Sequence, residues 1–131
     1  MNTEIMIRKM TEEDCEEVWK LQKTCFSTPW SLESIREMFT TEGYLSLTAR
    51  EHDSIVGYIG FKAVLDEADI TNVAVHPRWR RRGIGKILLA DLLREAVSRN
   101  VKRIFLEVRV SNEAALTLYG QAGLDRKSTR L

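Results

Sequence analysis

The sequence contains few cysteines, prolines and histidines, and it carries almost no net charge. Among its 131 residues there are two cysteines, two prolines and two histidines. Cys15 and Cys25 have no second cysteine pair and no histidine cluster beside them, which argues against a disulfide framework, and we expect no bound metal. A net charge of +1 excludes a global field that would draw the protein to nucleic acid or to an anionic membrane.

Long apolar runs are also missing. No stretch approaches the roughly 18 consecutive apolar residues of a membrane span, and the N-terminal MNTEIMIRKM lacks the apolar run of a signal peptide. We therefore expect a cytoplasmic, reduced protein. The composition that remains, 44% apolar and 30% charged residues, is that of an ordinary globular domain. The length fits one domain with its own core.

The residue pattern predicts an α/β domain with a mixed sheet. Alternating apolar and polar residues predict strands over 4–10, 44–51, 55–65, 69–76 and 102–110. Helical signals fall on 11–24 after a capping Thr11, on a short segment after Ser31, on 84–99 and on 111–123. The order is β-α-α-β-β-β-α-β-α, in which an antiparallel meander precedes one parallel strand–helix–strand crossover.

The helix predicted over 84–99 has a broad apolar face. Its apolar residues recur at steps of three and four: Ile84, Leu88, Leu89, Leu92, Leu93, Ala96 and Val97. We expect this face to be buried, and we expect Asn100 to end the helix.

Residues 78–86, RWRRRGIGK, combine four arginines, a lysine and two glycines. Three interpretations are open. Charge runs are usually solvated loops, and a run of arginines can bind nucleic acid, although here only Trp79 interleaves an aromatic ring. The third interpretation, a phosphate site, is favoured by position, because the segment joins a strand end to a helix start where unpaired N–H groups attract anions.

In the phosphate interpretation each residue type has a physical role. Gly83 and Gly85 let the backbone approach a diphosphate. Positive charge comes from the side chains of Arg80, Arg81, Arg82 and Lys86. Neither a Walker loop nor a complete Rossmann fingerprint is present.

A family resemblance adds to this reading. The pattern R-x-x-G-x-G at residues 80–85, directly after ITNVAVHP, resembles the acetyl-coenzyme A signature of the GNAT acetyltransferases, and the predicted order of elements matches that family. The stretches FSTPWS, DEADITNVAVHP, LEVRVSNEAALTLY and AG resemble its RimI-type branch, which acetylates the N-terminal alanine of ribosomal protein S18. The resemblance covers residues 3–123 and implies a GNAT domain over 1–123.

The resemblance implies roles for named residues. The pantetheine arm of acetyl-coenzyme A would pair with the backbone of Val73, Ala74 and Val75. The pyrophosphate would be held by Arg81–Lys86, chiefly by the amides of Arg82, Gly83, Ile84, Gly85 and Lys86. Asn112 would help to hold the cofactor, although a helix cap also explains it.

Glu107 and Tyr119 match the family's proposed general base and general acid. Acyl transfer from a thioester to an amine needs a proton acceptor on the amine side and a donor on the thiol side. Judged by pattern alone, Glu107 could face solvent beside Arg109, and Tyr119 could pack in a helix core. The implied function is an acetyltransferase that acts on a protein N-terminus, with ribosomal protein S18 as partner and no direct nucleic-acid or membrane contact.

The acceptor chemistry supports an N-terminal amine. An α-amino group, with a pKa of about 7.7–8.0, is partly neutral near pH 7, whereas a lysine with a pKa of about 10.4 is almost fully charged. A modest base therefore suits an N-terminus better. Lysine side chains or small amines are alternative acceptors, and a non-catalytic acyl-coenzyme A-binding module is an alternative function. An acidic rim for a basic peptide is available from Glu33, Glu37, Asp66, Glu67 and Asp69.

The C-terminal stretch departs from the family pattern. The family usually has Phe after the glycine of AG and then two further strands, whereas this chain has Leu124 followed by DRKSTRL. We expect residues 124–131 to form a flexible tail without a strand. The sheet edge left open predicts either a monomer or a dimer that pairs through that edge.

Overall fold

A six-stranded sheet forms the middle layer of the structure, a computed structural model that describes residues 4–107 and 129–130. The strands lie side by side in chain order: β1 (Ile5–Lys9), β2 (Tyr44–Glu51), β3 (Ser54–Val64), β4 (Glu67–Val75), β5 (Arg103–Glu107) and β6 (Thr129–Arg130). Strands β1 to β4 pair antiparallel, whereas β5 is parallel to β4 and β6 is parallel to β5. The predicted meander and the parallel crossover are confirmed.

The last strand differs from the sequence prediction. No strand is expected after residue 123, yet Thr129 pairs with Leu106 and Arg130 with Glu107. The physical reason is that the outer edge of β5 presents backbone N–H and C=O groups, to which an extended segment can pair whatever its side chains are.

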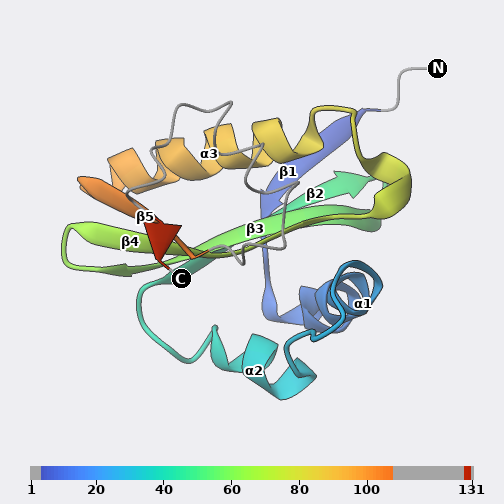
Figure 1. The fold of residues 1–131 in the computed structure, drawn as a ribbon, viewed down its shortest axis with the longest axis horizontal. Coiled ribbons are helices and arrows are strands. Elements are labelled where there is room, and N and C mark those ends of the chain that lie inside the picture. Colours follow the sequence, from blue (N-terminus) through green and yellow to red (C-terminus); the bar gives the residue numbers. More distant parts are fainter. Residues whose placement is uncertain (1–3, 108–128, 131) are drawn as a thin grey trace.

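Helices cover both faces of the sheet (Figure 1). Helix α3 (Ile84–Ser98) lies on one face, and α1 (Cys15–Cys25) and α2 (Leu32–Glu37) lie on the other. There are also two short 3-10 turns: η1 (Glu12–Asp14) precedes α1, and η2 (Pro77–Trp79) follows β4. The helix predicted over 111–123 lies outside the described residues. Among the helices that the structure describes, none is long and apolar enough to cross a membrane.

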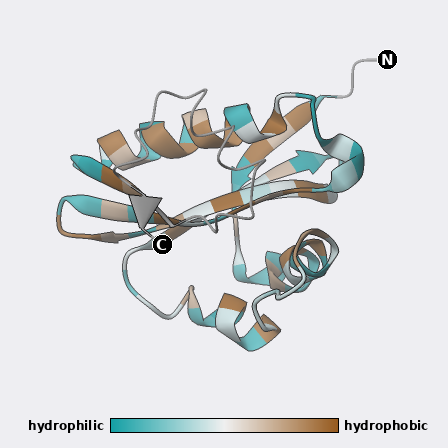
Figure 2. Cartoon of the chain, viewed as in Figure 1, coloured by the Kyte–Doolittle hydropathy of each residue, from teal (hydrophilic) through white to brown (hydrophobic). Residues whose placement is uncertain are grey.

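One hydrophobic core lies on each face of the sheet, between the sheet and the helices that cover it. The core under α3 includes Ile59 and Phe61 of β3 with Leu88 and Leu92 of α3. The core on the α1–α2 side includes Val18, Leu21, Ile35 and Tyr58. In Figure 2 apolar residues alternate with hydrophilic ones along α3, as expected for a helix with one buried face.

The predicted burial of α3 is confirmed for Ile84, Leu88, Leu89, Leu92 and Ala96, and Leu93 packs partly buried against the same core. Val97 is the error, because its side chain is 73% exposed. It lies in the last turn, next to where Asn100 adopts a left-handed backbone (φ 63°) and the chain turns away. Asn100 ends the helix as predicted.

Gly57 fixes how closely the start of α3 approaches the sheet. A Cβ atom at Gly57 would lie 3.3 Å from Leu88 Cδ1, 3.4 Å from Ile84 Cγ2 and 3.1 Å from the Ala74 carbonyl oxygen. A side chain at this position would therefore push α3 outward. Because of Gly57, the first two turns of α3 lie directly over β3, beside the end of β4.

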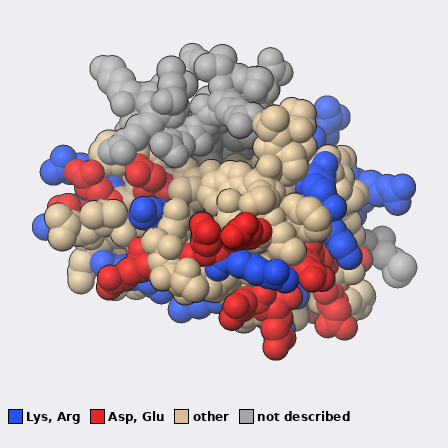
Figure 3. Space-filling model, turned by 90° about the horizontal axis from the view of Figure 1, so that it is seen from below, with Lys and Arg blue, Asp and Glu red and all other residues tan. Residues whose placement is uncertain are grey.

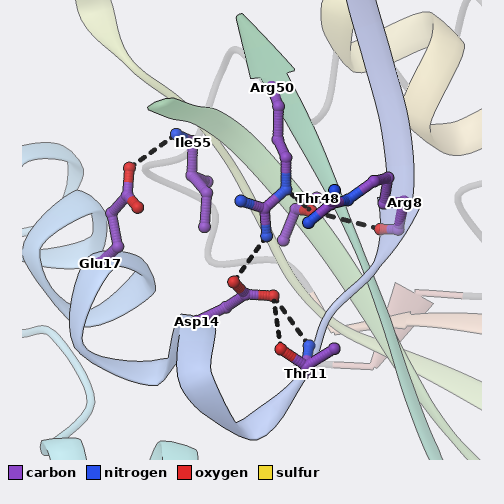
Figure 4. A network of polar contacts seen from close by, with 7 residues as sticks. All are labelled: Arg8, Thr11, Asp14, Glu17, Thr48, Arg50 and Ile55. Atoms are coloured by element: carbon purple, nitrogen blue, oxygen red, sulfur yellow. Dashed lines mark hydrogen bonds and ion pairs between the residues drawn. The ribbon is translucent and has the colours of Figure 1, made fainter. Parts of the chain in front are cut away.

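The start of α1 also differs from the prediction of one helix over 11–24. Thr11 precedes the 3-10 turn η1, and the α-helix begins at Cys15 and ends at Cys25. The Thr11 amide donates to Asp14 Oδ2 at 2.8 Å, and the opposite carboxylate oxygen of Asp14 contacts Arg50 at 2.6 Å (Figure 4). These contacts hold the first turn in the tighter geometry. The predicted cap of α2 is confirmed, since Ser31 Oγ accepts from the Ser34 amide at 3.1 Å.

Candidate active site

The start of α3 presents a row of backbone N–H groups that no described residue accepts. The first helical hydrogen bond runs from the Ile87 amide to the Gly83 carbonyl, at 3.1 Å. In the part of the chain that the structure describes, no hydrogen bond has an amide of residues 82–86 as its donor. Since the helix dipole adds partial positive charge here, these five amides are donors of the kind that an anion can accept.

The backbone before α3 is shaped to aim these amides outward. Arg81 (φ 65°) and Gly83 (φ 78°) both adopt the left-handed conformation. For Arg81 this conformation costs roughly 1 kcal/mol, a strain that is typical of functional loops. A Cβ atom on Gly83 would meet no described residue within 4 Å, so none of these residues blocks the approach of a ligand to Gly83.

The basic side chains of the segment divide into two pairs. Arg80 Nε donates to the Val75 carbonyl at 3.1 Å, and the guanidinium of Arg82 stacks 4.7 Å from the centre of the Trp79 ring. Arg81 and Lys86 are exposed and make no contact of this kind with any described residue. The charges free to meet a phosphate are therefore those of Arg81 and Lys86, whereas Arg80 ties the loop to the end of β4.

Next to this loop the outer edge of β4 forms an open edge, in the sense that no strand of the described residues lies beside it. Its described pairing with β5 ends at Ile70 and Leu106, so beyond Ile70 only β3 pairs with it among the described strands. The His76 amide donates to Val56 on β3 at 2.8 Å. Because backbone groups alternate sides along a strand, Ala74 also faces β3, whereas Val73 and Val75 face the open edge.

This alternation refines the predicted pantetheine contacts. Val73 and Val75 lie where an extended ligand could pair with their backbone groups. Ala74 presents its backbone to β3, where it is paired with Tyr58, and its side chain is buried on the α1–α2 side. The Val75 carbonyl already accepts from Arg80.

A β-bulge lies where the described pairing of β4 with β5 ends. Gly60 of β3 is paired with Asn72 and the next residue, Phe61, with Ile70, so Thr71 is an extra residue in β4. Bulges bend a strand away from its neighbour and occur beside active sites. The bulge also turns Asn72 toward the face that holds α1 and α2.

Asn72 is a candidate that the sequence analysis missed. Its Nδ2 atom is buried and has no hydrogen-bond partner among the described residues. It lies at the bulge, one residue before Val73. A polar residue within the apolar run ITNVAV is the signal that could have identified it.

The predicted catalytic residues can be placed only in part. Glu107 ends β5, and because Leu106 is level with Ile70, the backbone of Glu107 lies level with the bulge. The Glu107 side chain, Tyr119 and Asn112 lie outside what the structure describes. Their roles remain predictions.

Two shallow grooves lie on the α1–α2 side. A groove of about 340 Å³ is lined by Trp30, Ser34, Glu37, Met38, Thr41 and Tyr44. A second, of about 540 Å³, shares Glu37 and is also lined by Glu12, Glu33 and Arg36. Figure 3, which views this face, shows acidic side chains interspersed with basic ones. Of the predicted acidic rim, Glu33 and Glu37 line these grooves, whereas Glu67, at the start of β4, pairs with Arg103 of β5 at 3.7 Å.

The remaining candidate groups have structural partners. Cys15 and Cys25 are free thiols, and burial raises the pKa of each. Cys25 Sγ lies 3.5 Å from the Val75 carbonyl oxygen. His76 Nδ1 accepts from the Arg78 amide at 3.1 Å, which makes it a cap for η2. No three metal-ligating side chains come together among the residues described.

Comparisons with known proteins identify the family. The Acetyltransferase (GNAT) family matches residues 15–124. The [ribosomal protein bS18]-alanine N-acetyltransferase of Salmonella typhimurium is 35% identical over 132 residues, which cover 99% of this chain and 85% of that protein. The crystal structure of the ribosomal-protein-S18-alanine N-acetyltransferase from Escherichia coli superposes with a TM-score of 0.84 and 31% identity, over 92% of this chain and 77% of that one.

A more distant structure shares the fold. PaiA N-acetyltransferase from Thermoplasma acidophilum, solved in complex with coenzyme A, has a TM-score of 0.75 at 22% identity and covers 91% of this chain and 88% of its own. The matched residues include β4, the basic loop and α3, which carry the unpaired amides and the open strand edge. The chain is a member of the GNAT family of acetyltransferases.

Proposed function

We propose that this chain transfers the acetyl group of acetyl-coenzyme A to the α-amino group of a protein N-terminus, and that the N-terminal alanine of ribosomal protein S18 is the acceptor. The observation that carries the proposal is the row of five amides at the start of α3 that have no acceptor among the described residues, next to the open edge of β4. The names of the relatives supply the acceptor.

The chain offers matching groups for each part of acetyl-coenzyme A. Amides of residues 82–86 suit the diphosphate, which needs donors and positive charge, and Arg81 and Lys86 add charge nearby. The backbone groups of Val73 and Val75 suit the amide-containing pantetheine arm, which can pair with a strand edge. A thioester held along this edge would point toward the bulge at Thr71, level with the backbone of Glu107.

The chemistry then needs two proton transfers. The bound thioester supplies an activated acetyl group. The neutral amine nitrogen forms a bond to the carbonyl carbon while the carbon–sulfur bond breaks. Glu107 would accept the proton that the amine loses, directly or through water, and Tyr119 would donate a proton to the departing sulfur, which leaves as the thiol.

Binding and transfer are tested separately. Calorimetry with acetyl-coenzyme A measures the first. The second is followed by mass spectrometry on a peptide that begins Ala-Arg, beside an otherwise identical peptide with a blocked N-terminus and an internal lysine, and beside spermidine. We expect acetyl-coenzyme A to bind and only the free N-terminus to be acetylated. Acetylation of the lysine or of spermidine alone would reject the N-terminal acceptor, and absence of binding would reject the acyltransferase itself.

Substitution of the two predicted catalytic residues tests the mechanism. Glu107→Gln and Tyr119→Phe should each lower kcat by about a hundredfold, because general acid–base catalysis contributes roughly 10²–10⁴ in rate. Both should leave the Kd for acetyl-coenzyme A within about twofold. Glu51→Gln, the same change at the end of β2, is the matched control and should leave kcat unchanged. Unaltered turnover in Glu107→Gln would remove that residue from the mechanism.

A further inference from the structure

Gln22 is a buried polar side chain for which the proposed chemistry has no use. It lies in α1, only 1% exposed, among the apolar residues of the α1–α2 core. A buried amide without partners would destabilise the fold by about 1–3 kcal/mol. Both ends of the Gln22 amide are instead hydrogen-bonded, and to parts of the chain that are far apart in sequence.

One end of the amide holds the sheet. Gln22 Nε2 donates to the hydroxyl of Tyr58 at 2.5 Å, and Tyr58, in the middle of β3, is itself almost completely buried. Burial raises the pKa of Tyr58, and the hydrogen bond from Gln22 offsets only part of that effect. The phenol therefore stays neutral throughout the physiological pH range, and the link does not change with pH there.

The other end holds the loop between α1 and α2. Gln22 Oε1 accepts from the backbone amide of Trp30 at 2.7 Å. This contact fixes the C-terminal end of the loop. The N-terminal end of the loop is fixed by the hydrogen bond from the Phe26 amide to the Gln22 carbonyl, at 2.8 Å. One residue thus connects the sheet to both ends of the loop.

The loop joins the two parts of the candidate site. It begins after Cys25, whose sulfur lies beside the Val75 carbonyl at the open edge of β4. It ends at Trp30, which lines the groove of about 340 Å³ together with Glu37 and Tyr44. A peptide that lies in this groove and extends to the open edge of β4 would pass along this loop.

We propose that Gln22 is a positioning residue for the acceptor: by bridging Tyr58 to the Trp30 amide, it holds the α1–α2 loop as a fixed wall between the open edge of β4 and the groove beside Trp30. This inference rests on the proposed function. It assigns to Gln22 the binding of the acceptor peptide and not the binding of acetyl-coenzyme A, whose groups lie on β4 and α3.

Three variants separate this role from a merely structural one. Gln22→Leu removes both hydrogen bonds and should raise the KM for the Ala-Arg peptide about tenfold, because small displacements of positioning groups have large kinetic effects. The Kd for acetyl-coenzyme A should stay within about twofold. Gln22→Met keeps the length of the side chain but forms neither hydrogen bond, so it should raise the acceptor KM as Gln22→Leu does and separate the loss of the hydrogen bonds from a loss of volume. Thr24→Val, an exposed change in the last turn of the same helix, is the control and should alter neither constant.

The outcomes are distinguishable. An acceptor KM that is unchanged in Gln22→Leu, or that changes by the same factor as the Kd for acetyl-coenzyme A, would overturn the inference while the proposed function stands. A wild-type chain that binds acetyl-coenzyme A but acetylates no N-terminus would overturn the proposed function and this inference with it. If Gln22→Leu does not fold, Tyr58→Phe replaces it. That variant keeps the Trp30 contact but loses the anchor, and it should raise the acceptor KM by about threefold with the same selectivity.

Discussion

The starts of α1 and α3 handle their polar groups in opposite ways. At the start of α1 the Asp14 carboxylate accepts from Thr11 and pairs with Arg50, whose Nε donates to Thr48 at 3.2 Å (Figure 4). At the start of α3 five consecutive amides have no acceptor among the described residues. Both segments join a strand to a helix, so local secondary structure does not explain the difference.

The difference shows at which helix start the described residues satisfy the polar groups of the chain. Around α1, acidic side chains supply the acceptors from within the chain, and even the Ile55 amide of β3 is bound by Glu17, at 2.6 Å. The first turn of α3 contains no acidic residue at all. A helix start without an acidic residue in its first turn leaves its donors to water or to an external anion.

The largest expected effect is a loss of stability at the start of α1. Asp14→Ala leaves the guanidinium of Arg50 buried and unpaired, with side-chain exposures of 8% for Arg50 and 12% for Asp14 in the intact pair. We expect the free energy of unfolding to fall by about 3–5 kcal/mol, measured by urea denaturation. Asp53→Ala, in the exposed β2–β3 turn, should change it by less than about 0.5 kcal/mol. A similar loss of unfolding free energy in both variants would show that the Asp14–Arg50 pair contributes no more to stability than an exposed residue does.

Acid should weaken the same pair. Burial disfavours the charged form of Asp14, but hydrogen bonds from Arg50 and Thr11 and the charge of Arg50 outweigh it and lower the pKa of Asp14. A carboxyl with a lowered folded-state pKa contributes stability above its unfolded value, about 3.9, and loses it as the pH falls through the folded value.

Unfolding free energies at about pH 7, 5 and 3 should therefore be level between the first two and fall toward the third. Asp14→Asn cannot ionise and should lack this part of the acid loss. The loss should be smaller than that of Asp14→Ala, because a protonated carboxyl still forms hydrogen bonds. Identical pH profiles for wild type and Asp14→Asn would contradict the role given to the pair.

The start of α3 is tested by Gly83→Ala. The added methyl group meets nothing within 4 Å in the part of the chain that the structure describes, so the variant should lose only roughly 1 kcal/mol of stability, from the left-handed backbone. If the diphosphate lies against Gly83, the same methyl group should weaken acetyl-coenzyme A binding about tenfold in calorimetry. An affinity within twofold of wild type would place the ligand elsewhere.

The smallest effects should come from single basic side chains. Arg81→Ala and Lys86→Ala should each weaken acetyl-coenzyme A binding about two- to fivefold at low salt, and the difference should shrink at about 0.5 M salt, because exposed charges are screened. Arg78→Ala, in the same run but before the amide row, is the control. Arg80→Lys should weaken binding although it keeps the charge, because the Val75 carbonyl loses its Nε donor. Equal loss from Arg78→Ala would indicate a general charge effect.

Much of the fold could be predicted because its signals are local. Alternation in YLSLTARE gave the bounds of β2, and the apolar periodicity of ILLADLL gave the buried face of α3. Val97 was wrong because periodicity does not reveal where a helix passes beyond the core. The basic loop was located correctly, yet the engagement of Arg80 and Arg82 depends on Val75 and Trp79, whose positions are set by the fold.

Residues paired over long distances in the chain could not be found this way. Gln22 meets Tyr58 across 36 positions, and Asn72 is turned by a bulge that no sequence pattern announces. Arg50 belongs to the alternating pattern of β2, and nothing in that pattern indicates that its side chain is buried against Asp14.

By itself the sequence determined the order of elements as far as β5, the helix start after the Arg/Gly run and the family resemblance, because each depends on neighbouring residues. Only the tertiary structure decided which donors stay unpaired. Whether a polar group is satisfied depends on what the folded chain brings within about 3 Å of it, and at α1 the fold brings Arg50 and Thr11, whereas at α3 it brings nothing described.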